Sequence, residues 1–230
     1  MNRIRKSLAA VIIAGVIAAG ASAEAAPITL VGGTAGSIPG SIAENDFIGT
    51  LFPGPEIGGY FGAELYVYTA STVLFEFFGA EAGYHNEFKV NGTEQFDHPG
   101  GTIISSSLSS PLASYVYNHV GGLLPFSFEV NNDARTVVNG ANPNDNFLSD
   151  LFRTPNFFAT CNPFSGIRGA GGTNCSSVYL FLDDGGAGPD DNHDDMLVRV
   201  SVQSVPEPAT LGLLAIGLVG LAGSRSRRRR

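Results

Sequence analysis

Apolar and polar positions alternate along the middle of the chain in the pattern of short β-strands. In residues 196–202 every second side chain is apolar and the others are mixed, which places one face of a strand against a core. Turn-forming Gly, Pro, Asn and Ser interrupt the chain about every ten residues. Runs rich in aromatic and β-branched residues predict further strands at 112–118, 124–130 and 178–182.

Four further runs form two pairs that are close enough in sequence to predict hairpins. Residues 65–69 and 72–78 are separated by a short turn, so we expect them to pair with each other. An Asn-Gly dipeptide at 91–92 separates residues 88–90 from 94–96, and this dipeptide favours a two-residue hairpin turn.

Regularly spaced short strands predict an all-β domain, a single β-sandwich with a jelly-roll-like order of strands. Residues 131–156 and 157–174 lack a strand pattern, so we interpret them as long loops. We see no internal repeat and no second domain boundary, and the body at 24–204 has a length typical of one domain.

The N-terminus has the pattern of a secretory signal peptide at residues 1–23. A basic start precedes an apolar run from Leu8 to Ala19, and the small residues Ala21-Ser22-Ala23 follow. We expect signal peptidase to cut between Ala23 and Glu24, with a cut after Ala25 as a second option and an uncleaved anchor as the alternative. The chain is therefore predicted to be exported.

The C-terminus, residues 205–230, has the order of a membrane-anchored tail. Two prolines in Val205-Pro206-Glu207-Pro208 disfavour a helix there, and an uncharged run from Leu211 to Gly223 follows. Five arginines end the chain and favour the cytoplasmic side. The pattern predicts a transmembrane helix that anchors a precursor in the inner membrane; an ordinary C-terminal anchor is the alternative.

This tail resembles the PEP-CTERM sorting signal, which is also filed under the name of an ice-binding protein's C-terminal domain. The resemblance implies processing by exosortase, a membrane-embedded Cys transpeptidase of Gram-negative bacteria that make exopolysaccharide. Val205, Pro206, Glu207 and Pro208 are then recognition residues. It further implies delivery to the cell envelope, surface or extracellular matrix. Nothing in the body has the pattern of an ice-binding repeat.

The body without the two ends has a more negative net charge than the whole chain. The whole chain has 13 basic and 21 acidic residues, and the ends hold eight of the basic residues and one acid. The body therefore has five basic against twenty acidic residues, a net charge of −15. Nucleic acid and anionic lipid would repel such a surface, whereas cations would be attracted.

The two cysteines of the chain, Cys161 and Cys175, are expected to form a disulfide in an oxidising compartment. A catalytic thiol is the alternative, but no histidine lies near either cysteine in sequence.

An aspartate-rich segment at 183–195 is the strongest chemical signal in the body. Hard cations such as Ca²⁺ bind six to eight oxygen atoms, and glycines let backbone carbonyls contribute. The spacing begins like an EF-hand loop at 190, but Asp195 stands where Gly is needed and Ser201 where Glu belongs. The candidate Ca²⁺ ligands are Asp183, Asp184, Asp190, Asn192, Asp194 and Asp195.

Two segments of the body, 185–195 and 83–88, resemble pieces that recur in PEP-CTERM surface proteins. The resemblance implies a shared β-domain and a metal-organising loop, without an established activity. The alternative for the acidic segment is a solvated turn capped by Asp side chains. Zinc is not expected at His193, because no cysteine flanks it and the other three histidines lie far off in sequence.

The sequence gives no positive support for an enzyme. His-Glu-x-x-His, Gly-x-Ser-x-Gly and phosphate-binding Gly-loop motifs do not occur. We therefore expect a non-enzymatic protein of the envelope or of the exopolysaccharide matrix of a biofilm. A carbohydrate-binding module is the alternative, motivated by Tyr60, Tyr66, Tyr68, Tyr84, Tyr115 and Tyr117. A matrix hydrolase that uses paired acids is a weaker alternative.

Overall fold

The computed structural model describes residues 27–40, 46–131, 135–144, 154–161, 174–185 and 193–203. All of them belong to one compact unit, Ala25–Ser204. The predicted signal peptide and sorting tail lie outside the described residues, so their boundaries stay predictions. Within the described ranges, no helix is both long and apolar enough to cross a membrane.

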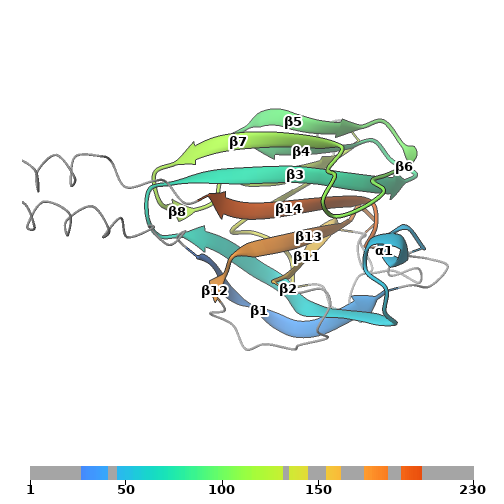
Figure 1. Ribbon diagram of the computed structural model, residues 1–230, viewed down its shortest axis with the longest axis horizontal. Helices are drawn as coiled ribbons and strands as arrows, with labels where there is room; N and C mark the ends of the chain where they lie inside the picture. Colours follow the sequence, from blue (N-terminus) through green and yellow to red (C-terminus); the bar gives the residue numbers. More distant parts are fainter. Residues whose placement is uncertain are drawn as a thin grey trace, which may run out of the picture. The chain divides into compact units, whose positions relative to one another are not determined.

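The described strands form two antiparallel sheets, the larger of which has ten strands (Figure 1). Its main path runs β12 (Asn174–Cys175), β1 (Ile28–Pro39), β2 (Glu56–Val67), β11 (Asn156–Thr160), β13 (Ser177–Asp183), β14 (Met196–Gln203), β3 (Ser71–Ala82) and β6 (Gly101–Ile104). Off this path, β7 (Ala113–His119) pairs with β3 and β8 (Gly122–Leu123) pairs with β2. The smaller sheet has the order β10 (Arg135–Val138), β9 (Phe126–Val130), β4 (Asn86–Val90) and β5 (Thr93–His98).

The main core lies between the two sheets and is rich in phenylalanine. Phe88 of β4 is completely buried, and its ring lies 5.5 Å from that of Phe75 on the larger sheet and 5.0 Å from that of Phe128. Val198 and Leu180 face the same cluster from the centre of the larger sheet. The predicted β-sandwich is confirmed as two packed antiparallel sheets, and the jelly-roll order stays a prediction.

A second apolar cluster covers the other face of the larger sheet. The short helix α1 (Asp46–Leu51) contributes Leu51, and Phe52 follows it with its ring 5.3 Å from that of Tyr179. Phe181 and Leu197 belong to this outer cluster, although Leu180 and Val198 beside them belong to the main core. β13 and β14 are therefore buried on both faces, which explains their nearly continuous apolar sequences.

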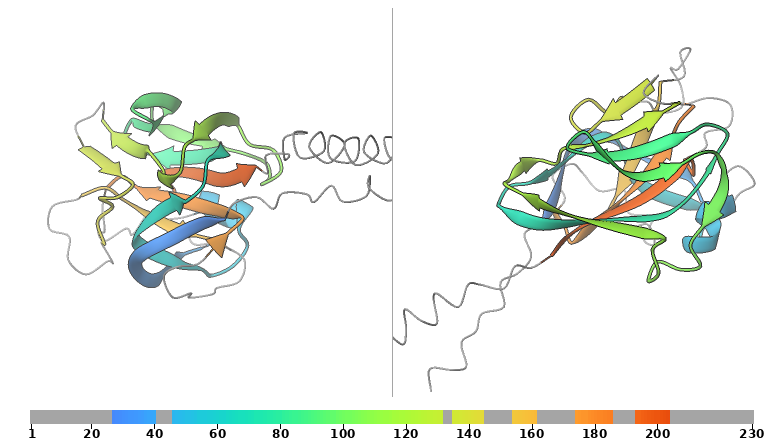
Figure 2. Two further views of the ribbon diagram at one scale, coloured as in Figure 1. Left: turned by 90° about the vertical axis from the view of Figure 1, so that its left-hand side faces the viewer. Right: turned by 90° about the horizontal axis from the view of Figure 1, so that it is seen from above.

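β1 and β2 form a long curved ribbon, as Figure 2 shows. Three glycines in the left-handed region, Gly32, Gly33 and Gly62, lie within the paired part of these two strands, with φ of 68°, 76° and 67°. At Gly33 a Cβ atom would lie only 2.7 Å from the carbonyl oxygen of Phe61. The β1–β2 pair therefore needs glycine here, both for the backbone conformation and for the close approach of the two strands.

Most strands predicted from the sequence are confirmed. β7, β9, β13 and β14 cover the four expected runs, with boundaries shifted by up to two residues. The Asn-Gly hairpin is also confirmed: β4 pairs with β5, and Asn91 and Gly92 have φ of 52° and 74°. Two successive positive φ values are those of a type I′ turn, which matches the twist of a hairpin.

The other predicted hairpin, 65–69 with 72–78, is wrong. Its runs fall on β2 and β3, but three strands lie between them in the larger sheet. The end of β2 pairs instead with β8, and the backbone of Leu65 is bound by the side chain of Asn139. The start of β3 pairs with β7 and β14. Other segments thus satisfy the backbone groups that a hairpin would have paired.

The predicted loops are also partly wrong, because β10 lies within 131–156 and β11 spans the boundary at 156–157. β11 has only five residues, and all of them are buried between β2 and β13. A strand buried on both faces has no polar alternation, so its pattern did not stand out in the sequence.

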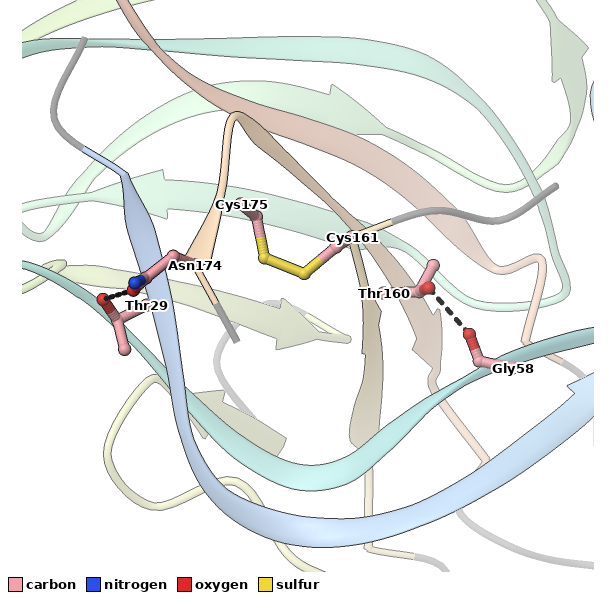
Figure 3. The surroundings of a disulfide bond; sticks show 6 residues. All are labelled: Thr29, Gly58, Thr160, Cys161, Asn174 and Cys175. Carbon is pink, nitrogen blue, oxygen red and sulfur yellow. Dashed lines mark hydrogen bonds between the residues drawn. A yellow bond between two sulfur atoms is a disulfide. The ribbon is translucent and has the colours of Figure 1, made fainter. Parts of the chain in front are cut away.

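The predicted disulfide joins Cys161 to Cys175, whose Cα atoms are 5.5 Å apart (Figure 3). Cys161 directly follows the central strand β11, and Cys175 ends the edge strand β12. Thr160 Oγ1 donates a hydrogen bond to the Gly58 carbonyl on β2 at 2.7 Å, beside the bridge. The bond therefore ties an edge of the larger sheet to its middle and contributes about 3 kcal/mol in the chain-entropy model.

Candidate metal centre

Four aspartates lie at the ends of β13 and β14, where the chain leaves one strand and enters the next. Asp183 is the last residue of β13 and Asp184 follows it, while Asp194 and Asp195 precede β14. All four are at most 5% exposed. Leu182 pairs with Met196, so the two Asp-Asp pairs are held together by the ladder of the two strands.

Backbone hydrogen bonds fix the aspartate side chains within this cluster. The Asp184 N–H donates to Asp195 Oδ2 at 2.7 Å, and the Gly185 N–H donates to Asp183 Oδ1 at 2.9 Å. The Asp194 carbonyl accepts a hydrogen bond from the Glu81 N–H of β3 at 2.9 Å. The Gly185–Asp183 bond is the local side-chain-to-backbone bond expected for an Asp turn. The other two bonds join separate segments of the chain, and all three form in a buried place.

Two asparagines from distant parts of the chain complete the cluster. Asn86, the first residue of β4, donates from Nδ2 to Asp184 Oδ2 at 2.7 Å. Asn156, the first residue of β11, lies opposite Asp183 in the ladder. Both asparagines are fully buried, and within the described part of the chain Asn86 Oδ1 and both amide atoms of Asn156 have no hydrogen-bond partner. Buried amide oxygens in this state are costly unless something else binds them.

The electrostatics of the cluster are unfavourable for four ionised carboxylates. Burial raises the pKa of the Asp195 carboxyl well above its usual value, and the charge of Asp184 raises it further. The Asp184 N–H lowers this pKa, whereas the charges of Asp183 and Asp194 raise it again. Two cations of the sandwich pair with other acids, since Lys89 binds Glu87 and Glu129 and Arg199 binds Glu76. The cluster therefore favours either a proton or an added cation.

A pH dependence follows for the metal-free protein. Because the folded-state pKa of Asp195 is raised above the unfolded value of about 3.9, the folded state holds the proton more tightly. The contribution of Asp195 to stability is fully present below about pH 4. It is lost as the pH rises through the folded-state pKa.

We expect the free energy of unfolding of the wild type, relative to Asp195→Asn, to fall as the pH is raised in metal-depleted buffer. Urea unfolding of both proteins between about pH 4.5 and 8 measures this difference. The variant serves as the reference because it keeps every other titrating group. A difference that stays flat, or that grows with pH, would show that Asp195 is not the buried, proton-binding carboxyl described above.

The structure brings together four of the six residues predicted as Ca²⁺ ligands, namely Asp183, Asp184, Asp194 and Asp195. Asp190 and Asn192 lie outside the described residues. Asn86 and Asn156 were missed, because they are distant in sequence from the acidic segment. A signal for Asn86 was nevertheless present, because it lies in 83–88, one of the two segments that resemble recurrent pieces of PEP-CTERM surface proteins. Its Nδ2 also lies 3.4 Å from the carbonyl oxygen of Asp195, in the other such segment.

His193 lies in the core beside this cluster rather than in an exposed loop. It is fully buried, with its ring 5.7 Å from that of Phe61 and 6.2 Å from that of Phe158. Aromatic contacts on the outer cluster thus account for its position, and no cysteine takes part.

Carboxylate and amide oxygens are the ligands that Ca²⁺ takes in proteins, at 2.3–2.6 Å in the usual case. The chemical types of donor in the cluster suit such an ion: four carboxylates and two amide oxygens, all buried and without a sulfur ligand. A transition metal would be expected to recruit imidazole or thiolate instead.

Comparison with known proteins bears on the tail. Residues 204–229 match the model of a short C-terminal sorting signal. This family is the PEP-CTERM protein-sorting motif, so the resemblance of Val205-Pro206-Glu207-Pro208 and the following segment is confirmed. The chain carries this motif, and PEP-CTERM proteins are exported, processed by exosortase and sorted to the cell surface. No curated protein matches the chain.

Proposed function

We propose that the chain is a non-enzymatic protein of the cell envelope or exopolysaccharide matrix of a Gram-negative bacterium. Its body is a β-sandwich that Ca²⁺ stabilises. The observation that carries the proposal is the buried cluster of Asp183, Asp184, Asp194 and Asp195, together with the amide oxygens of Asn86 and Asn156, which have no hydrogen-bond partner among the described residues. Exosortase and signal peptidase are the expected processing partners, and the inner membrane holds the precursor.

Calcium explains both unusual features of the cluster at once. A dication offsets the repulsion among the carboxylates, which burial strengthens. It also binds the two amide oxygens to which no group in the described part of the chain donates a hydrogen bond. A solvated acidic turn, the alternative from the sequence, fits less well because all four aspartates are buried.

Calorimetric titration of Ca²⁺ into residues 24–204 tests the proposal. The hydrophobic core residues given above all lie between Ile28 and Val202, so this segment contains the complete sandwich. We expect saturable binding that Asn86→Leu weakens tenfold or more, because the variant removes an inward amide without changing charge. Gln95→Leu, which removes a half-buried amide of β5 and also leaves the charge unchanged, is the matched control. Absence of binding would reject the proposal.

A carbohydrate-binding module is the second candidate, favoured by one exposed aromatic pair. The rings of Tyr66 and Tyr68 stack with centroids 5.6 Å apart, and Tyr68 is 66% exposed. The other tyrosines fit less well: Tyr60 is buried, Arg135 covers the Tyr84 ring, and Tyr115 and Tyr117 pack on the core. A glycan array with residues 24–204 and Tyr68→Ala separates this candidate from a module without sugar affinity.

A matrix hydrolase remains the weaker alternative. Its test is incubation of the exported protein with the polysaccharide of the producing strain, followed by an assay for new reducing ends. Release of reducing ends that Asp195→Asn abolishes would support the hydrolase, whereas no release would leave the non-enzymatic proposal in place.

A further inference from the structure

The outer face of the smaller sheet carries a second group of metal-ligating side chains. His85 precedes β4, Glu87 lies within it, and Asp97 lies directly opposite Glu87 on β5. One ligand atom from each of the three lies within 4.8 Å of the others. His85 Nε2 contacts Asp97 Oδ1 and lies 3.8 Å from Glu87 Oε1.

The pairing of strands gives this group an excess of negative charge. Glu87 is flanked on one side by Asp97 of β5 and on the other by Glu129 of β9. Like charges directly opposite each other in a sheet are destabilising. Lys89 offsets the charge on one side, because its Nζ contacts Glu129 and lies 3.1 Å from Glu87 Oε2. The other oxygen of Glu87 faces His85 and Asp97.

We propose that His85, Glu87 and Asp97 form a metal site for a divalent first-row transition metal, with Zn²⁺ as the representative ion. One imidazole nitrogen and two carboxylate oxygens are ligands that Zn²⁺ takes at about 2.0–2.2 Å, with solvent in the fourth position. Two such ligands of a tetrahedral ion lie about 3.4 Å apart, close to the 3.8 Å between His85 Nε2 and Glu87 Oε1.

Neighbouring groups fix the positions of His85 and Glu87, whereas the side chain of Asp97 can change its conformation. The backbone carbonyl of His85 accepts a hydrogen bond from the Asn131 N–H at 2.7 Å, which fixes the chain at this position. Glu87 is held by Lys89. The Asp97 side chain is 47% exposed on an edge strand, so it is free to rotate away from His85 and admit the ion.

This site is separate from the aspartate cluster, although one strand carries ligands of both. Side chains alternate along β4, so Asn86 points into the molecule and binds Asp184, while Glu87 points to the other face. The donor sets also differ: the inner cluster offers oxygens alone, whereas the outer group includes an imidazole, which favours transition metals. Sequence reasoning missed the outer group because its residues come together only through the β4–β5 register.

Zinc titration of the full chain in detergent, without a polyhistidine tag and saturated with Ca²⁺, tests the site. We expect one equivalent of Zn²⁺ to bind, and His85→Gln and Asp97→Asn to weaken it at least tenfold. Glu94→Gln removes the same charge from the same strand and should change the affinity less than twofold. Asp195→Asn should also leave Zn²⁺ binding intact, which separates this result from the fate of the Ca²⁺ proposal.

Co²⁺ gives a second readout, because its visible absorption reports the ligands directly. We expect a Co²⁺ spectrum that His85→Gln abolishes and Glu94→Gln preserves. Asp97→Asn, at an exposed position, keeps the test meaningful even where His85→Gln does not fold. The site would be overturned by an absence of Zn²⁺ binding, or by equal affinities of Asp97→Asn and Glu94→Gln; His85 and Asp97 would then be an ion pair only.

Discussion

Millimolar Ca²⁺ should raise the unfolding midpoint of residues 24–204 by roughly 5–11 °C. Binding to the folded state alone stabilises by about 2.7 kcal/mol at a hundredfold excess of ligand over Kd. For a domain of this size, each kcal/mol shifts the midpoint by about 2–4 °C. Scanning calorimetry with Ca²⁺, and then with excess chelator, measures the shift.

The double variant Asp194→Asn with Asp195→Asn should differ from the wild type in stability, and the direction of this difference should depend on whether Ca²⁺ is present. With chelator present it should be at least as stable as the wild type, because two buried like charges are gone. With Ca²⁺ present it should be less stable, because the ion has lost two ligands. Glu94→Gln, an exposed acid on β5, should follow the wild type in both conditions. If Ca²⁺ does not change the unfolding midpoint of the wild type, the cluster is an acidic turn that binds no metal.

Replacing Glu207 with Ala should leave the chain unprocessed and bound to the inner membrane. The residue lies in the matched sorting motif, which exosortase must recognise, and outside the described β-sandwich, whose last residue is Gln203. We therefore expect loss of sorting without loss of folding. Membrane fractionation and intact mass of the protein, in a strain that has exosortase, measure the effect.

Thr210→Ala is the matched control for the sorting experiment. It changes a polar residue of the tail close to the motif but keeps Val205-Pro206-Glu207-Pro208 intact. Processing should continue in this variant and stop in Glu207→Ala. Normal surface delivery of Glu207→Ala would mean that the tail acts as a simple membrane anchor.

The strands were predictable where their signal is local. Alternation marks β14, and the Asn-Gly turn marks β4 and β5, because these features depend on neighbours within a few residues. The partner of β2 was not predictable in this way. Leu65 is bound by Asn139, 74 residues away, and no local pattern encodes such a contact.

The same contrast holds for the candidate centre. The aspartates of 183–195 stand out because they are close together in sequence. Asn86 reaches Asp184 across 98 residues, so only the packing of the two sheets reveals it as a partner. Burial could not be predicted from the sequence either. An acidic run usually lies in water, whereas the four described aspartates of this one are buried and contact β3, β4 and β11.

The bond between Cys161 and Cys175 makes the stability of the domain depend on the compartment. Thiols stay reduced in the cytoplasm, so the precursor lacks this link until it has been exported. The missing contribution of about 3 kcal/mol is large beside the 5–15 kcal/mol that stabilises a typical domain. Before export, the edge strand β12 and its neighbour β1 are held only by their hydrogen bonds and packing. The precursor is thus easier to unfold for translocation than the mature protein. Formation of the disulfide after export then makes unfolding of the domain less favourable.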